Sequence, residues 1–109
     1  MNYLANAFSL NMLEVEDLKL IRVMRVPAAE VPIDAVSVIG HPDTASLLSS
    51  YLDRKVEVNR TTLTLTTDDV LYVAQYRGPR LPEGATELPN GASLVFFEVT
   101  LMEECENLQ

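Results

Sequence analysis

A helix is predicted to begin within the segment Ile39-Gly40-His41-Pro42-Asp43-Thr44. Pro42 suits the first helical position, because the N–H group that proline lacks has no helical partner there. Apolar side chains then recur on one face of residues 43–52, as an amphipathic helix requires. They are Leu47, Leu48, Tyr51 and Leu52. This pattern places His41 beside the unpaired backbone N–H groups of a helix N-terminus, which favour a bound anion.

Two interpretations of His41 follow from this position. It is the one histidine of the chain, and histidine has an ordinary pKa of about 6.5, close to neutral pH. Beside a bound phosphate, His41 is therefore a candidate for proton transfer. The alternative is a helix-start residue whose polar edge faces water, and position alone favours that alternative.

Length and composition predict one compact domain. The chain has 109 residues with 48% hydrophobic content, and an acidic tail starts at about residue 103. It has no run of about 18 apolar residues, and its first residues lack the basic start and apolar run of a signal peptide. We therefore expect no membrane partner and a cytoplasmic location. One cysteine, Cys105, excludes an internal disulfide, and with a single histidine it predicts no metal site and no cofactor.

The net charge of −8 excludes a general binder of duplex nucleic acid, because such a protein needs a basic face to displace counterions. A small phosphorylated ligand stays compatible, since the planar fork of arginine matches phosphate oxygens. Three arginines lie at predicted strand ends and loops: Arg60, Arg77 and Arg80. Surface pairing with nearby acids is the better interpretation of Arg22, Arg25 and Arg54.

The pattern along the chain predicts a small single-domain α/β fold with a mixed sheet and a few short helices. Strands are expected over residues 2–6, 18–26, 70–77 and 93–102, with a short or broken helix over 27–38. Apolar residues alternate with polar ones at residues 56–58 and with threonines at residues 62–66, and a turn signal follows at residues 67–69. This segment is therefore predicted to form a hairpin with residues 70–77. The longest loop is expected over residues 77–91, which are rich in glycine and proline.

Four segments carry a resemblance to a known family. They are Tyr3-Leu4-Ala5-Asn6-Ala7-Phe8-Ser9-Leu10-Asn11-Met12-Leu13, Ile39-Gly40-His41, Asn59-Arg60 and Arg80-Leu81-Pro82-Glu83-Gly84. In this order and at these spacings, the chain resembles the viral ring nucleases. These type III anti-CRISPR proteins degrade cyclic tetra-adenylate, a second messenger of type III CRISPR defence. The resemblance runs from Tyr3 to about Glu98 and is weakest over residues 25–36, which are rich in proline.

The resemblance implies a homodimer with its ligand site at the subunit interface, and a phosphodiesterase that cleaves cyclic tetra-adenylate without a metal. His41 matches the catalytic histidine of the family, and Glu83 matches its assisting glutamate. Arg60 and Arg80 match the ligand-binding arginines. The other implied ligand-binding residues are Asn6, Ser9, Asn11 and Gln75.

The chemistry of such a cleavage is consistent with these residue types. The 2′-hydroxyl of the substrate can attack the phosphorus in line with the departing 5′-oxygen, which an imidazolium at His41 can protonate. The products would be linear di-adenylates with 2′,3′-cyclic phosphate ends. Glu83 would orient either His41 or the 2′-hydroxyl. The alternative for Glu83 is the exposed third residue of a type I turn in Leu81-Pro82-Glu83-Gly84.

Two other classes of function stay open. A sponge protein would bind the cyclic nucleotide without cutting it, but pure binding needs neither His41 nor Glu83. An interaction protein would block a host complex through its acidic surface, but that leaves the segment from Asn6 to Leu13 unexplained.

Overall fold

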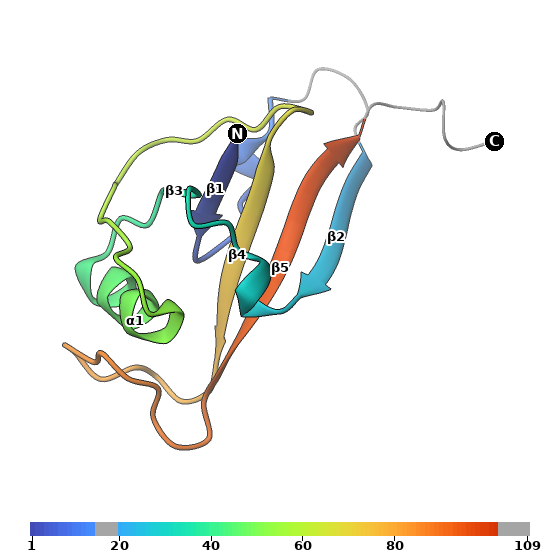
Figure 1. Cartoon of the computed structure of the whole chain (residues 1–109). Helices are drawn as coiled ribbons and strands as arrows, with labels where there is room; N and C mark the ends of the chain where they lie inside the picture. The colour runs from blue at the N-terminus through green and yellow to red at the C-terminus, as the bar shows by residue number, and fades with distance from the viewer. Residues whose placement is uncertain (15–19, 103–109) are drawn as a thin grey trace.

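The computed structural model describes residues 1–14 and 20–102, which form a five-stranded sheet, one α-helix and two 3₁₀ turns (Figure 1). The strands are β1 (Asn2–Ala5), β2 (Leu20–Val26), β3 (Val36–Ser37), β4 (Val70–Arg77) and β5 (Ser93–Met102). The helix is α1 (Pro42–Leu52), and the 3₁₀ turns are η1 (Leu10–Met12) and η2 (Ala28–Glu30). The strand order in the sheet is β2-β5-β4-β1-β3. The predicted small α/β fold with a mixed sheet is confirmed.

The sheet combines parallel and antiparallel pairing. β1 runs parallel to β3 and β4, with Tyr3 opposite both Val36 and Leu71. β5 runs antiparallel to β4 and β2, with Phe96 opposite both Ala74 and Val26. β4 therefore has a neighbouring strand along each of its edges.

The predicted hairpin between residues 56–66 and β4 is wrong. Residues 56–66 are irregular apart from one isolated parallel bridge, which joins Leu65 to Leu13. Leu63 and Leu65 are buried in the same hydrophobic cluster as Leu71 and Val73, so their alternation reflects burial against the sheet rather than pairing within it. The turn at residues 67–68 is present, and β4 forms its hairpin with β5 across the 78–92 loop.

The other predicted elements agree more closely with the structure. β5 has the predicted bounds, and β4 matches residues 70–77. β2 begins at Leu20, and Leu18, where that strand was predicted to start, lies outside the described residues. The broken helix predicted over 27–38 is the single turn η2 followed by β3. Val31 after η2 is extended (φ −68°, ψ 116°), as the following Pro32 requires.

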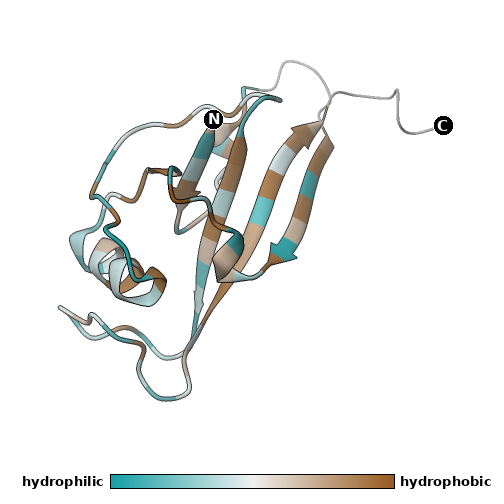
Figure 2. Ribbon diagram, viewed as in Figure 1, coloured by the Kyte–Doolittle hydropathy of each residue, from teal (hydrophilic) through white to brown (hydrophobic). Residues whose placement is uncertain are grey.

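Hydrophobic side chains cover both faces of the sheet. On one face, Leu4, Tyr72 and Phe96 pack with Ile39 and with Leu48 of α1. The opposite face holds Ala5, Leu63, Leu65, Leu71, Val73, Val99 and Leu101. Figure 2 shows hydrophobic residues interspersed with hydrophilic ones along the strands. Full burial of a side chain such as Leu48 contributes about 1.5–3 kcal/mol, which fixes α1 against the sheet.

The predicted helix and its apolar face are confirmed. Leu47 and Leu48 are buried, and the ring of Tyr51 stacks on Phe96 with 5.8 Å between centroids. The helix ends at Asp53, whose backbone is left-handed (φ 53°, ψ 45°) and whose N–H donates to the carbonyl oxygens of Ser49 and Ser50. Within residues 1–14 and 20–102, no helix has the length and apolar character needed to cross a membrane.

Candidate functional site

His41 caps the N-terminus of α1. Its backbone is extended (φ −109°, ψ 124°), and its Nδ1 accepts a hydrogen bond of 3.2 Å from the backbone N–H of Asp43. Pro42 occupies the start of the helix, as predicted. The side chain of His41 is exposed. His41 therefore lies at the helix start, as predicted, and its Nδ1 atom is engaged with the backbone.

Arg60 lies over Gly40, the residue before His41. The backbone N–H of Asn59 donates to the carbonyl of Ile39 over 2.8 Å, and its side-chain amide donates to the carbonyl of Ser37 over 2.7 Å. These bonds align residue 60 with Gly40. A Cβ atom added to Gly40 would lie 3.1 Å from Cβ and 3.3 Å from Nε of Arg60. The lack of a side chain at Gly40 thus allows the close approach of Arg60.

The 78–92 loop reaches from the sheet to the N-terminus of α1 (Figure 1). Near its start, the hydroxyl of Tyr76 donates to the carbonyl of Pro79. Further along, the backbone N–H of Gly84 donates to Oδ2 of Asp43 over 2.9 Å. The base of the loop is narrow, because a Cβ atom on Gly78 would lie 2.7 Å from Cβ of Ala92. Gly78 is therefore required for this close approach.

The turn around Glu83 differs by one residue from the prediction. The N–H of Ala85 donates to the carbonyl of Pro82 over 3.1 Å, so the turn spans residues 82–85 and Glu83 is its second residue. Gly84 is the third residue, with a φ of +77°. Glycine adopts a positive φ without a Cβ clash, so this backbone conformation selects Gly84 rather than Glu83 for the third position.

One open cleft brings three predicted site residues together. It has a volume of about 630 Å³, within the range of small-molecule sites. His41 lies at the helix side, and Arg80 and Glu83 lie in the loop. The complete lining is His41, Asp43, Thr44, Arg80, Leu81, Pro82 and Glu83. Among the residues that the structure describes, neither Arg80 nor Glu83 forms an ion pair. Both charges are thus available to a ligand.

A smaller hollow of about 160 Å³ adjoins the cleft and shares Thr44 and Leu81 with it. Two predicted ligand-binding residues, Asn6 and Gln75, line this hollow. Its other walls are mostly apolar and are formed by Leu47, Leu48, Ala74, Tyr76 and Leu94. The hollow therefore brings two predicted ligand-binding residues together in a mostly apolar surround, and the side-chain amide of Gln75 donates to the carbonyl of Tyr76 over 3.2 Å.

Ser9 and Asn11, which were also predicted to bind the ligand, line neither the cleft nor the hollow. Ser9 caps η1, and its Oγ accepts a hydrogen bond of 3.2 Å from the backbone N–H of Asn11. In the single chain, this local role accounts for Ser9. Arg60 lies close to the cleft through its contact with Gly40 but is not part of its lining.

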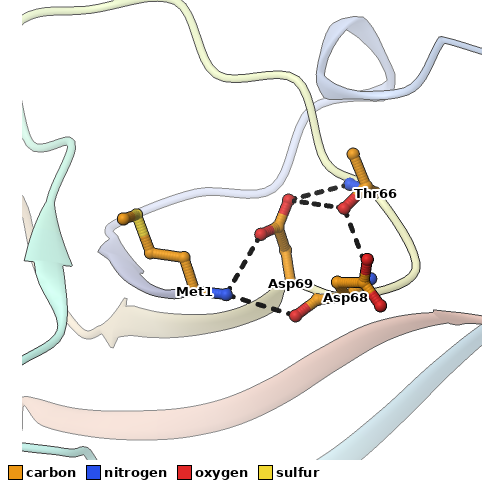
Figure 3. Close-up of polar contacts among 4 residues, drawn as sticks. All are labelled: Met1, Thr66, Asp68 and Asp69. Carbon is orange, nitrogen blue, oxygen red and sulfur yellow. Dashed lines mark hydrogen bonds and ion pairs between the residues drawn. The ribbon is translucent and has the colours of Figure 1, made fainter.

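The titratable groups with clearly shifted pKa values lie outside the cleft. Burial acts to raise the pKa of Asp69, but hydrogen bonds from Thr66 and the Met1 ammonium outweigh it and lower the pKa (Figure 3). Burial, together with nearby Glu98, raises the pKa of Tyr72. Over residues 1–14 and 20–102, no three His, Cys, Asp or Glu side chains are grouped so that they could hold a metal ion.

Comparison with known proteins identifies the family. The model of the STIV B116-like family matches residues 2–91, which include every residue of the cleft and the hollow except Leu94. The chain belongs to this family. Among solved structures, this B116-like chain is similar to B116 of Sulfolobus turreted icosahedral virus (STIV), with a TM-score of 0.72 at 23% sequence identity. The similarity covers 90% of this chain and 97% of that chain. No curated protein matches the sequence.

Two polar residues that line the B116-like cleft, Asp43 and Thr44, were not among the site residues predicted from the sequence. Asp43 and Thr44 follow the helix start directly and read as ordinary first-turn residues. The contact between Asp43 and Gly84 joins residues 41 positions apart, and no local pattern reports such a contact. Thr44 could have been found from its place on the same helical turn as His41.

The cleft combines groups suited to an anion with groups suited to proton transfer. The N-terminus of α1 and Arg80 favour a phosphate, and Arg60 adds a second guanidinium nearby. His41 adds an imidazole and Glu83 a carboxylate to the lining, and both are side-chain types that serve as general acids or bases. This arrangement supports chemistry at a phosphodiester.

Proposed function

We propose that this protein is a metal-independent ring nuclease that binds cyclic tetra-adenylate and cleaves it, thereby switching off type III CRISPR immunity. The observation that carries the proposal is the meeting of His41, Arg80 and Glu83 in one cleft at a helix N-terminus. His41 belongs to one segment of the resemblance to viral ring nucleases, and Arg80 and Glu83 belong to another. The viral source of the similar B116 structure supports a role in a virus, which would place the protein in the host cytoplasm.

In the proposed reaction, the 2′-hydroxyl of one adenylate loses its proton to solvent water as its oxygen forms a bond to the adjacent phosphorus, and the bond from that phosphorus to the 5′-oxygen breaks. The backbone N–H groups at the start of α1 and the guanidinium of Arg80 stabilise the charge that develops on the phosphoryl oxygens. His41 gives a proton to the departing 5′-oxygen, and Glu83 orients either His41 or the attacking 2′-hydroxyl. The product end is a 2′,3′-cyclic phosphate.

The cap at His41 constrains this role. While Nδ1 accepts the N–H of Asp43, a neutral imidazole carries its proton on Nε2. An imidazolium carries protons on both nitrogens and so gives up the cap, which stabilises a helix by about 0.5–2 kcal/mol. A phosphate bound at the helix N-terminus favours the charged form and replaces the cap as a partner of the first-turn N–H groups. Ligand binding and the charging of His41 would therefore be coupled.

The adjoining hollow would hold an adenine base. Asparagine and glutamine amides can donate to and accept from the N6 and N7 edge of adenine in a paired geometry. Asn6 and Gln75 both line the hollow beside apolar walls, and Asn6 would supply such an amide, because the amide of Gln75 donates to the carbonyl of Tyr76. Because the hollow shares Thr44 and Leu81 with the cleft, a base in the hollow would leave its phosphate near His41.

A homodimer fits the shape of the substrate. Cyclic tetra-adenylate has a repeating outline of near two-fold symmetry, whereas one 12.1 kDa chain presents the cleft of His41, Arg80 and Glu83 once. A two-fold dimer supplies each group twice in symmetric positions. Two copies of Arg60 and Arg80 would face the ring, and two cuts would release two linear di-adenylates.

A second candidate is a binding protein that sequesters the ring without cleaving it. The capping bond from Asp43 N–H to Nδ1 of His41 favours this candidate, because it gives His41 a structural role that needs no catalysis. In that case Arg80 and the helix N-terminus would still bind phosphate.

Incubation of the protein with cyclic tetra-adenylate and EDTA, followed by chromatography of the products, tests both candidates. Linear di-adenylate supports the ring nuclease, and an intact ring that co-elutes with the protein supports the sponge. An intact ring with no binding overturns both. Light scattering on the same sample measures whether the protein is a dimer.

A further inference from the structure

We infer that Asp43 is a positioning residue that holds segment 80–83 of the loop against the N-terminus of α1. Its Oδ2 accepts the backbone N–H of Gly84 over 2.9 Å, and the side chain is half-buried in the wall of the cleft. In the part of the chain that the structure describes, this is the one hydrogen bond between α1 and the 78–92 loop. The effect on cleavage rests on the proposed function, whereas the effect on the loop does not.

The bond between Asp43 and Gly84 lies directly after the loop segment that lines the cleft. Segment 80–83 supplies Arg80, Leu81, Pro82 and Glu83 to the cleft, and it is held at each end by one polar contact. The hydroxyl of Tyr76 bonds to the carbonyl of Pro79 just before the segment, and Asp43 bonds to Gly84 just after it. Both Gly84 and Glu83 are otherwise exposed. Loss of the Asp43 bond would remove the polar contact at the second end of this segment, which carries Arg80 and Glu83.

A simpler role for Asp43 is an acid that interacts favourably with the helix dipole. The two roles make different demands on the side chain. A dipole interaction needs the negative charge, whereas the bond to Gly84 needs an acceptor oxygen at the right place. An asparagine keeps the oxygen and removes the charge, and an alanine removes both. Since a carboxylate in the cleft also repels phosphate, Asp43→Asn should not weaken binding of an anionic ligand.

The test compares wild type, Asp43→Ala and Asp43→Asn, with the exposed acid variant Asp34→Ala as a control. Steady-state cleavage of cyclic tetra-adenylate gives kcat and KM, and the rate of trypsin cleavage after Arg80 reports the mobility of segment 80–83 without any ligand. Misplacement of a catalytic group by about 1 Å lowers the rate by on the order of 10². We therefore expect Asp43→Ala to lower kcat by about that factor and to speed cleavage after Arg80. Asp43→Asn and Asp34→Ala should keep the wild-type kcat and the wild-type tryptic rate.

The inference is overturned if Asp43→Asn is as impaired as Asp43→Ala, since charge would then be the property that matters. It is also overturned if Asp43→Ala keeps the wild-type kcat and tryptic rate. If wild type itself does not cleave the ring, the proposed function fails, and the tryptic rates alone decide whether Asp43 holds the loop. If Asp43→Ala does not fold, wild-type values for Asp43→Asn support the inference and reduced values overturn it.

Discussion

Two polar regions of this molecule use similar residues in opposite ways. In the N-terminal corner, formed by Met1, Thr66, Asp68 and Asp69, the carboxylate of Asp69 is surrounded by donors (Figure 3). It accepts from the N–H and hydroxyl of Thr66 at 2.9 and 3.1 Å and from the Met1 ammonium at 3.3 Å, and its side chain is 11% exposed. In the cleft, by contrast, Glu83 and Arg80 are exposed and form no ion pair among the described residues.

The difference separates charge that serves the fold from charge that is available for a ligand. The corner joins the start of β1 to the start of β4, where the N–H of Val70 also donates to the carbonyl of Met1 over 3.0 Å. A carboxylate whose acceptor sites are occupied has little left to offer a substrate. Arg80 and Glu83 of the cleft form no such ion pair among the described residues. A bound ligand could therefore pair with them.

The largest expected effect is the loss of cleavage on substitution of His41, a residue of the cleft. Asparagine is also a good helix cap, so His41→Asn should keep the fold and the binding of cyclic tetra-adenylate. Without a proton donor, cleavage should fall by on the order of 10²–10⁴. Single-turnover cleavage and calorimetric binding measure the two effects separately.

His41→Ala serves as the comparison, because it removes both the cap and the proton donor. It should lose cleavage to the same extent and should also lower the free energy of unfolding by about 0.5–2 kcal/mol. Wild-type cleavage by His41→Asn would remove His41 from the catalytic role and leave it a helix cap.

A second test concerns Arg80. Its replacement by alanine removes a charge-assisted contact to phosphate and should weaken binding of cyclic tetra-adenylate by about 1.5–3 kcal/mol. The fold should be unaffected, since Arg80 is exposed and forms no ion pair among residues 1–14 and 20–102. Arg22→Ala, on the exposed strand β2, is the matched control and should bind as wild type does. Equal affinities for wild type and Arg80→Ala would exclude Arg80 from the site.

The corner should show the opposite behaviour. Asp69→Ala leaves several donors without their acceptor and should lower the free energy of unfolding at pH 7 by about 1–3 kcal/mol, measured with urea. Cleavage of cyclic tetra-adenylate should not change. Asp68→Ala is the neighbouring control, because the corner uses only backbone atoms of Asp68. A loss of cleavage in a folded Asp69→Ala protein would contradict the separation of the two regions.

The pH dependence of the same variant has a defined sign. The pKa of Asp69 is lowered from its ordinary value of 3.8 in the folded protein. The stabilisation is therefore fully present above that value and is lost as pH falls through the lower folded pKa. The difference in unfolding free energy between wild type and Asp69→Ala should accordingly shrink in strong acid.

The smallest effect is expected at Gly40. A Cβ atom there would crowd Arg60 and force its side chain away from its rotamer, at a cost of about 0.5–1.5 kcal/mol. Gly40→Ala should weaken binding of cyclic tetra-adenylate by up to this amount. The same change in an Arg60→Ala background should have a smaller effect on binding, because the guanidinium and Cγ are removed, although the Cβ of residue 60, 3.1 Å from the added atom, remains. An equal effect in both backgrounds would show that Gly40 acts on the site by another route.

Local patterns were sufficient for part of this structure. Pro42 fixes the first position of α1, and the residue before it, His41, is thereby placed at the cap. The apolar run of β5 and the bounds of β4 were also predicted, because a strand buried between neighbours leaves a continuous apolar signal. The placement of the predicted site residues Arg80 and Glu83 in a glycine- and proline-rich loop follows from composition in the same way.

Only the tertiary structure decided which of these segments meet. The alternation of Leu63 and Leu65 is the same whether a segment pairs in a sheet or covers one, so the sequence alone predicted a hairpin that does not form. The bond from Gly84 to Asp43 crosses 41 positions, and the approach of Arg60 to Gly40 depends on how residues 56–60 return along β3. The free energy of hydrophobic burial is proportional to the buried area and does not specify a partner. Each of these contacts, by contrast, needs two particular groups at a defined distance. The sequence therefore determined the helix, most strands and the chemistry of the site residues, and the packing of the sheet determined that His41, Arg80 and Glu83 share one cleft.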